Sequence, residues 1–421
     1  MPFATLGLAP ELLPAFSRAL DAAGYTAPTP IQAQAVAPIL RGDDLLACAA
    51  TGSGKTAAFA LPLLQQAALL PPGRRVHGLV LVPTRELATQ VGDTLQALGR
   101  YLPRRIKVAA VAGGASINPQ MLKLRGGADI VVATPGRLLD LAAHNALDLG
   151  AVRTLVLDEA DRLLALGFEA ELGRILALLP RRRQTLLFSA TFPAAVEGLA
   201  QRLLRGPRRI GEDAAVPATI RQRAIEVDST QRTALLRHLL RSEAWPQALV
   251  FVASQRGADN LAEKLHKAGV SAQPFHGELS QGRRNQALAG FRSGQLQVLV
   301  ATDVAARGLD ITQLPVVVNY DLPRATADYT HRIGRTGRAG ADGLAVSFVD
   351  ATSATHLRLI EKRQQLRVPR ERIAGFEPAS AAVTAAEAAP QAGGIKGKRP
   401  SKKDKLRAAS ATGAGGLPAK D

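Results

Sequence analysis

The chain has 421 residues, of which 47% are hydrophobic, a length too great for one compact core and suited to two domains. With 53 Lys and Arg against 35 Asp and Glu, its formal net charge is +18, which favours a polyanionic partner because Lys and Arg that neutralise phosphates release counterions. The single cysteine, Cys48, excludes a disulfide framework and a cysteine-based metal cluster within one chain.

Residues 1–13 include the acidic Glu11 and no Lys or Arg, so they lack the positively charged start of a signal peptide. No apolar run is long enough to span a bilayer, and stretches such as Gly78–Val82 have the length of a strand. We therefore expect a cytoplasmic protein that has no membrane partner.

Short apolar runs alternate with helix-like segments between about residues 43 and 205. Several runs are nearly continuous in Val, Leu and Ile, as in strands that are covered on both faces. Helices are expected at Thr84–Leu98 and Pro193–Leu203. The pattern predicts a parallel sheet wrapped by helices. Its expected strands are Asp44–Ala47, Gly78–Val82, Lys107–Val111, Ile130–Ala133, Thr154–Leu157 and Thr185–Phe188.

The alternation stops at Gly206–Ala218, which contains two prolines, and restarts beyond it. The chain is therefore expected to form two α/β lobes, residues 1–207 and 219–368, joined by a linker at 208–218, with no sequence repeat between the lobes. The second lobe's expected strands are Ala224–Val227, Ala248–Val252, Gln297–Val300, Val316–Asn319 and Leu344–Phe348, and its expected helices are Thr230–Leu240, Ala258–Ala268 and Gln281–Arg292.

Residues 369–421 form a low-complexity basic tail that we expect to be largely disordered. Of the 12 lysines, six lie at or after Lys396, among many Ala, Gly, Ser and Pro residues. This composition buries too little apolar surface to fold. Such an arm is expected to add non-specific RNA affinity, and a solvated tail without a role is the alternative.

A glycine-rich segment between an expected strand and an expected helix predicts a nucleotide site. Its glycines let backbone N–H groups surround phosphate oxygens at a helix N-terminus. Lys55 is expected to neutralise the β- and γ-phosphates, and the Thr56 hydroxyl to bind Mg²⁺. Ala49 departs from the generic pattern, which has glycine there, and a simple turn is the alternative. The segment reads Ala49-Ala50-Thr51-Gly52-Ser53-Gly54-Lys55-Thr56.

The expected strand Thr154–Leu157 runs directly into the acidic sequence Asp158-Glu159-Ala160-Asp161. A carboxylate at a strand end can complete a nucleotide site, so Asp158 is expected to hold Mg²⁺ through water and Glu159 to polarise the attacking water as general base. An ordinary acidic helix start is the alternative, but an apolar strand that ends in Asp-Glu downstream of a phosphate loop argues against it.

These four residues spell D-E-A-D, and the rest of the chain resembles the DEAD-box family of ATP-dependent RNA helicases. The resemblance spans roughly residues 3 to 361 and implies two tandem RecA-like domains, each a mostly parallel sheet covered by helices on both faces. The segment Gly24–Gln32 resembles the family's adenine-recognising segment. That likeness implies that Gln32 bonds to the adenine edge, that Tyr25 stacks on the ring and that Ala27 lies beside them. Phe3 is the candidate for the family's aromatic residue upstream.

Further segments resemble the family's RNA contacts, and each of those in the first lobe follows an expected strand, at the edge where open α/β sheets bind ligands. Glycine permits close approach of a phosphate, while arginine and threonine side chains can bind phosphate or sugar. The residues implied to contact RNA are Arg85, Gly114, Thr134 and Arg137 in the first lobe and Gly277 and Thr302 in the second.

The resemblance also implies that the two lobes share one ATP site. Gly308 and Asp310 are expected to touch ATP, and Arg335 and Arg338 to reach the γ-phosphate as arginine fingers. Four residues, Ser189, Thr191, Asp161 and His331, are expected to couple hydrolysis to strand separation.

The sequence therefore indicates an ATP- and Mg²⁺-dependent RNA helicase that separates short duplexes or remodels RNA–protein complexes, with little sequence preference from its core. Gly113–Gln120 and Asn319–Pro323 are most similar to the bacterial RhlE branch, which implies work in ribosome assembly or RNA decay and possible partners there. Two alternatives stay open: a DNA helicase or translocase, and an RNA clamp that binds without turnover.

Overall fold

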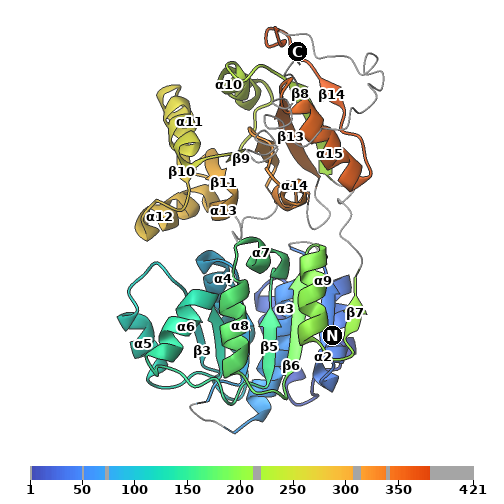
Figure 1. The fold of residues 1–421 in the computed structure, drawn as a ribbon, viewed down its shortest axis with the longest axis vertical. Helices are drawn as coiled ribbons and strands as arrows, with labels where there is room; N and C mark the ends of the chain where they lie inside the picture. The colour runs from blue at the N-terminus through green and yellow to red at the C-terminus, as the bar shows by residue number, and fades with distance from the viewer. Residues whose placement is uncertain are drawn as a thin grey trace, which may run out of the picture. The chain divides into compact units, whose positions relative to one another are not determined.

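Two parallel sheets organise the chain (Figure 1). The computed structural model describes residues 2–49, 52–71, 75–211, 220–306, 314–337 and 342–379. Residues 1–379 belong to one compact unit, and both sheets lie within it.

The first sheet has seven parallel strands in the order β3-β4-β2-β5-β6-β1-β7. Its central strands are buried along their whole length, as their nearly continuous apolar sequences predict. The strands are β1 (Leu45–Cys48), β2 (Gly78–Leu81), β3 (Val108–Val111), β4 (Ile130–Ala133), β5 (Thr154–Leu157), β6 (Gln184–Ser189) and β7 (Arg208–Ile210).

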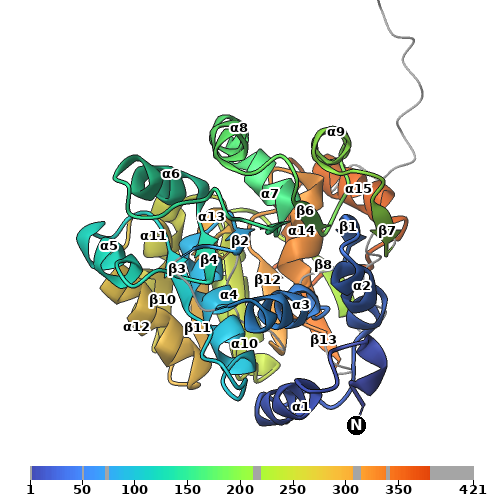
Figure 2. The same cartoon turned by 90° about the horizontal axis from the view of Figure 1, so that it is seen from below.

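Helices cover both faces of this sheet (Figure 2). Successive strand residues point to opposite faces, so Val80 packs with α3 and α4, while its neighbours Leu79 and Leu81 pack with α6 to α9. The helices are η1 (Ala4–Leu6), α1 (Leu13–Ala22), α2 (Pro30–Arg41), α3 (Lys55–Leu69), α4 (Arg85–Leu98), α5 (Asn118–Leu124), α6 (Pro135–Ala143), α7 (Ala160–Ala165), α8 (Glu169–Leu178) and α9 (Ala194–Leu203).

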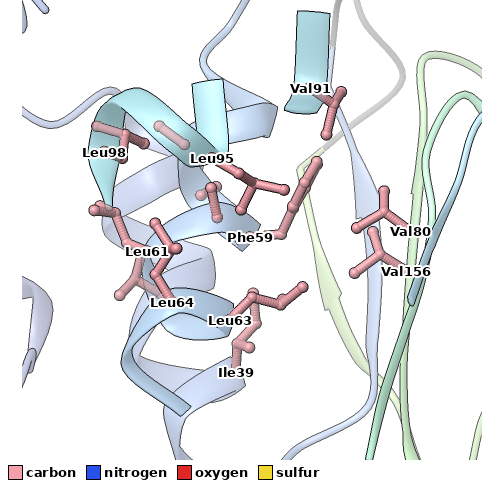
Figure 3. Close-up of a cluster of buried hydrophobic side chains, with 14 of the residues drawn as sticks. Ile39, Phe59, Leu61, Leu63, Leu64, Val80, Val91, Leu95, Leu98 and Val156 are labelled. Atoms are coloured by element: carbon pink, nitrogen blue, oxygen red, sulfur yellow. The ribbon is translucent and has the colours of Figure 1, made fainter. Parts of the chain in front are cut away.

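Phe59 of α3 lies at the centre of one of these two cores (Figure 3). It is fully buried, with Leu95 of α4 on one side and Val80 and Val156 of the sheet on the other. Truncation of such a ring to alanine typically costs about 3–5 kcal/mol. The cluster therefore anchors α3, whose first turn carries Lys55.

The second sheet repeats the topology of the first. Its order is β10-β11-β9-β12-β13-β8-β14, which matches the first sheet when its strands are renumbered from β8. The strands are β8 (Ile220–Glu226), β9 (Ala248–Val252), β10 (Ala272–Phe275), β11 (Val298–Thr302), β12 (Val316–Asn319), β13 (Gly343–Val349) and β14 (Arg370–Glu371). The helices are α10 (Arg232–Ser242), α11 (Gln255–Lys267), α12 (Gln281–Arg292), α13 (Asp303–Ala306), α14 (Thr326–Ile333) and α15 (Ala354–Gln364).

The two RecA-like parallel sheets confirm the expected fold class, and three strands correct the sequence-based boundaries. The expected linker 208–218 begins with β7, which pairs with β1, so its first three residues belong to the first sheet. The expected tail 369–421 begins with β14, which pairs with β8. Strand β10 was not expected, because Gln273 and Pro274 interrupt its apolar pattern. Proline is tolerated there since β10 is an edge strand.

None of the helices in the described part of the chain is long and apolar enough to cross a membrane.

Candidate nucleotide and RNA site

Strands β5, β6 and β1 are neighbours in the first sheet, so the segments that follow them meet at its carboxyl edge. These segments are the phosphate loop after β1, the acidic sequence after β5, and Ser189-Ala190-Thr191 at the end of β6. The backbone N–H of Ala49 donates to the carbonyl of Ser189 at 3.0 Å, which ties the first segment to the third. The sheet order therefore assembles three parts that lie far apart in the sequence.

Gly54 shapes the phosphate loop. Its φ is +95°, in the left-handed region, and it caps α3. A Cβ at this position would lie 2.5 Å from Nε2 of Gln32, so both conformation and space require glycine. Ala50 and Thr51 of the expected loop lie outside the described residues.

Lys55 supplies the positive charge of the loop. The side chain is 5% exposed, and its Nζ is buried without a hydrogen-bond partner among the described residues. The Ser53 hydroxyl is also buried without a hydrogen-bond partner among the described residues. Thr56 comes next after Lys55, in the first turn of α3, and its side chain is half-buried. The charge of Lys55 acts on the nearby Asp158 and Glu159, but its ammonium group bonds to neither of them, and a buried ammonium group that lacks hydrogen bonds is costly. The loop therefore fits a phosphate chain with its associated cation.

Asp158 and Glu159 are both 3% exposed at the end of β5. Burial raises the pKa of Asp158 to about 6, although the nearby Lys55 partly opposes the shift. A buried carboxylate of this kind gains from a cation, so the position fits Mg²⁺. The donor set of Asp158 and the Thr56 hydroxyl consists of the hard oxygens that this ion prefers.

Glu159 has a φ of +51°, which is unusual for a residue with a side chain and typical of constrained functional positions. Its N–H donates to Oδ1 of Asp158 at 2.9 Å. Burial opposes ionisation of Glu159, but the charges of Arg162, Lys55 and Arg335 outweigh it and lower the pKa. Glu159 is therefore an ionised carboxylate that can accept a proton.

Asp161 is the centre of the expected coupling group. Its N–H donates to Oγ of Ser189 at 3.3 Å, and its Oδ2 accepts from Oγ1 of Thr191 at 3.0 Å. Nε2 of His331, in the second lobe, lies 3.5 Å from the same Oδ2. Burial opposes ionisation of Asp161, but the hydrogen bond from His331 and the charge of Arg162 hold its pKa well below the usual range. All four expected coupling residues thus come together.

Gln32 links the adenine segment to the phosphate loop. Its Oε1 accepts from the N–H of Thr29 at 3.0 Å, and its Nε2 donates to the carbonyl of Gly54 at 3.2 Å. Tyr25 is partly buried beside the core, and Ala27 is exposed. Phe3 is 2% exposed within that core, so its ring packs against other side chains and offers no free face to a base.

The expected RNA contacts of the first lobe lie together beyond β2, β3 and β4. Nη1 of Arg85 donates to the carbonyl of Gly114 at 3.4 Å, and Nη2 of Arg137 donates to the carbonyl of Ala115 at 2.8 Å. Oγ1 of Thr134 accepts from the N–H of Gly113 at 3.3 Å. The strand order β3-β4-β2 brings these loops side by side.

In the second lobe, Thr302 ends β11 and Gly277 follows the neighbouring strand β10, so both lie at one sheet edge. Helix α12 contacts the first lobe directly. Nη2 of Arg284 lies 2.7 Å from Oε1 of Glu86, with both side chains largely buried, and Arg85 hydrogen-bonds to Gln281. The sequence did not single out Glu86, because an acid in the first turn of a helix is common.

Arg335 is 2% exposed and lines a pocket with Arg162 of the first lobe and with Asp303, His331 and Arg332 of the second. It is close enough to the acidic sequence to lower the pKa of Glu159. Arg338, Gly308 and Asp310 lie outside the described residues.

Arg162 and Arg332 are site residues that sequence reasoning missed. Nη2 of Arg332 donates to Oδ2 of Asp303 at 2.7 Å, and its Nη1 donates to Oδ1 of Asn319 at 3.0 Å. These bonds hold α14, which carries His331, against the ends of two strands. Arg162 forms an ion pair with Glu159. In the sequence each is only an arginine next to a residue of interest, and an arginine in such a place is usually a solvated surface residue.

Comparisons with known proteins agree with this geometry. Residues 29–199 match the family model described as DEAD/DEAH box helicase, and residues 231–340 match the helicase conserved C-terminal domain. The chain is 42% identical over 385 residues to the ATP-dependent rRNA helicase rrp3 of Sclerotinia sclerotiorum, a match that covers 89% of this chain and 78% of the relative. It is 40% identical to the DEAD-box ATP-dependent RNA helicase CshA of Bacillus subtilis, over 84% of this chain and 71% of the relative.

Among solved structures, Dbp5 of S. cerevisiae bound to RNA and ADP BeF3 is similar, with a TM-score of 0.79 and 32% identity. That match covers 88% of this chain and 95% of the other.

Proposed function

We propose that this chain, which belongs to the DEAD/DEAH box helicase family and is an ATP-dependent RNA helicase, has one ATP site shared by its two lobes. Through that site it separates short RNA duplexes or remodels RNA–protein complexes. The observation that carries this proposal is the meeting of Lys55, Asp158 and Glu159 from the first lobe with Arg335 from the second. Neither lobe holds all four residues, so the chemistry depends on both.

Within the proposal, Lys55 binds the β- and γ-phosphates of ATP, while Asp158 and Thr56 hold Mg²⁺, which would neutralise phosphate charge when bound. The unpartnered Nζ of Lys55 and the raised pKa of Asp158 support these roles. Residues 49–54 surround the phosphates with backbone N–H groups, and Gly308 and Asp310 contact ATP from the second lobe. At the base, Gln32, Tyr25 and Ala27 recognise adenine.

Glu159 is the proposed general base. It takes a proton from the water that attacks the γ-phosphate. Its lowered pKa keeps the carboxylate in the ionised form that a base requires and also makes it a weaker base, so the support for the role is its place beside Lys55 and Arg335 at the end of β5. Arg335, with Arg338, stabilises the negative charge that develops on the transferred group. The burial of Arg335 beside the acidic sequence supports its assignment as a finger.

RNA is proposed to bind across both lobes through Arg85, Gly114, Thr134, Arg137, Gly277 and Thr302. Arginine, threonine and glycine at these positions suit phosphate and sugar, which predicts little preference for base sequence. ATP binding and hydrolysis would be coupled to these RNA contacts by four residues, Ser189, Thr191, Asp161 and His331. The bonds that join Asp161 to residues of both lobes support that role.

The biological setting is also a proposal. One relative above is named an rRNA helicase, and the phrases Gly113–Gln120 and Asn319–Pro323 resemble the bacterial RhlE branch. The first likeness favours ribosome assembly, and the second fits ribosome assembly and RNA decay equally. A cytoplasmic location, partners from those processes, and lobe boundaries that place β7 in the first lobe and β14 in the second complete the proposal.

The decisive experiment measures ATP hydrolysis without nucleic acid, with RNA, and with DNA of matched length and sequence. A rate that rises with RNA and not with DNA is the expected result. Equal stimulation by DNA would favour a DNA translocase. RNA binding without any hydrolysis would favour a clamp.

A further inference from the structure

The amino edge of the first sheet, opposite the nucleotide site, carries an unusual set of arginines. In a parallel sheet the residues that precede the strands all gather at one edge. Figure 2 views the molecule from below, and Figure 1 shows this edge at the bottom of the first lobe, away from α7. The basic residues at or just before strand starts are Arg41, Arg75, Arg104, Arg105, Lys107, Arg153, Arg181, Arg182, Arg183, Arg205, Arg208 and Arg209.

Few acids balance this charge in the same segments. Asp44 and Asp129 are buried there and bind within the fold: Asp44 accepts from two backbone N–H groups, and Asp129 pairs with Arg104. Asp43 pairs with Arg41 at the surface. The basic edge therefore keeps most of its positive charge.

The fold does not require an arginine before each strand, because β9, β10 and β11 hold the same places in the second sheet as β2, β3 and β4 in the first and are directly preceded by neutral residues. Arginines of the second sheet lie instead in β8 (Arg221 and Arg223) and at the start of β14 (Arg367 and Arg370). The residues directly before β9, β10 and β11 are Gln247, Ser271 and Gln297. Each of these donates a side-chain hydrogen bond to a nearby carbonyl, as Gln184 does at the first lobe's edge. Neutral side chains therefore suffice to hydrogen-bond to the backbone carbonyls before a parallel strand, and the arginines of the first lobe are not needed for that purpose.

Several of the arginines are exposed and uncommitted. Within the described parts of the chain, Arg105, Arg153, Arg182, Arg208 and Arg209 form no ion pair with an acidic side chain. Burial and the nearby positive charge of Arg205 lower the pKa of Arg183, so like charges repel one another at this edge, and a bound polyanion would relieve that repulsion. The tail does not explain the overall charge either, since residues 380–421 contain eight Lys and Arg and three Asp and Glu, which leaves most of the +18 on residues 1–379.

We propose that this amino edge is a second RNA-binding surface, which holds the phosphate backbone of duplex RNA that flanks the strand in the core. Arginine forks match phosphate oxygens. The one Phe, Tyr or Trp in the described edge segments is Tyr101, and Arg18 and Arg100 already lie over its ring, at 4.4 and 5.7 Å, so the edge offers no open ring on which an unpaired base could stack. Backbone contacts without stacking suit a duplex. The inference rests on the proposed RNA helicase function and adds to it the means of choosing structured RNA.

The distance between the two edges determines which RNA reaches both. The strands between them have three to six residues, which span about 10–20 Å. A short single strand in the core would leave the amino edge empty. An RNA that continues into a duplex can reach it.

The test compares two full-length variants that each lose four exposed positive charges. The edge variant carries Arg153→Gln, Arg182→Gln, Arg208→Gln and Arg209→Gln. The control carries Arg358→Gln, Lys362→Gln, Arg363→Gln and Arg367→Gln, on α15 and just beyond it in the second lobe. Both keep the basic tail, so its contribution is the same in each.

The probes are a single-stranded RNA of about 10 nucleotides, which fits one binding track, and the same strand joined to a stable hairpin. Dissociation constants are measured from low to high salt. For the hairpin RNA, the edge variant is expected to bind about 10-fold or more weakly than the control, with a salt slope shallower by about 2–3.5, because up to four phosphate contacts are lost. Affinity for the short strand, and the ATPase rate that it stimulates, should match wild type, which also shows that the variant is folded.

Equal affinities and slopes for the edge variant and the control on hairpin RNA would overturn the inference. So would unchanged hairpin binding together with lost binding to polyglutamate or to phosphatidylserine vesicles, which would assign the edge to an acidic protein or a membrane. Failure of the proposed function looks different, because then the wild-type protein itself would show no RNA-stimulated hydrolysis.

Discussion

Arg162 and Glu159 form an ion pair inside the first lobe. Nη1 of Arg162 lies 2.9 Å from Oε2 of Glu159, and the two side chains are 3% and 4% exposed. The two residues are one turn apart at the start of α7, and the pair holds the proposed general base in one orientation. Arg162 also lines, together with His331 and Arg335 of the second lobe, the pocket where the lobes meet.

Arg162→Ala should lower kcat by about 10- to 100-fold, because a carboxylate displaced by an ångström no longer meets its water. The KM for ATP should change little, since Arg162 is not assigned to the phosphates. Removal of one partner from a buried pair also costs about 3–5 kcal/mol of folding stability, so a melting curve must accompany the kinetics. Arg162→Lys should recover part of the rate. A fully active alanine variant would show that the pair is not needed for positioning.

Glu159→Gln should bind ATP nearly as well as wild type and lose almost all hydrolysis. The amide keeps the size of the side chain but cannot take a proton, and loss of a general base costs about 10²- to 10⁴-fold. Exposed Glu169 at the start of α8 provides the control, as Glu169→Gln removes the same charge from the same lobe. Normal turnover by Glu159→Gln would assign the base elsewhere.

Arg335→Ala should leave ATP affinity largely intact and abolish RNA-stimulated turnover, with a loss of up to about 10³–10⁵ in rate. Because Arg335 is buried, a matched melting temperature must show that the second lobe is folded. Arg324→Ala, at an exposed position of the same lobe, is the control. Retained stimulation in the folded variant would refute the finger.

The ion pair of Glu86 with Arg284 should contribute to communication between the lobes. Either Glu86→Ala or Arg284→Ala is expected to reduce RNA-stimulated hydrolysis while the basal rate stays unchanged. If the pair acts as a unit, the double variant should be no worse than the singles, with a coupling energy of about 0.5–3 kcal/mol in a double-mutant cycle. Strictly additive losses would mean that the two residues act independently.

Ending the chain after Pro378 should weaken RNA binding and reduce its salt slope, because Lys and Arg of residues 380–421 would no longer neutralise phosphates. The binding of RNA by full-length and shortened protein is compared over a range of salt. An unchanged slope would leave the tail without an electrostatic role.

The sequence by itself predicted the interior strands and the ligands at their ends. Strands such as β4 and β5 are continuous apolar runs. A strand that is buried on both faces needs apolar residues at every position, so the run can be recognised in the sequence. Lys55 and Asp158 were predicted as ligands for a similar reason, since phosphate and Mg²⁺ chemistry restricts the residues that can stand directly after a strand; the structure buries both side chains at one edge of the sheet, and their ligand roles stay predictions.

Only the tertiary structure decided the edges and the pairings. Strands β7, β10 and β14 are edge strands with exposed or interrupted sequences, and they exist because β1, β11 and β8 offer unpaired backbone groups. The contacts of Arg162 with Glu159, and of Arg284 with Glu86, likewise depend on which side chains the fold brings together. A charged residue has no periodic pattern of its own, so its partner becomes known only when the chain is folded.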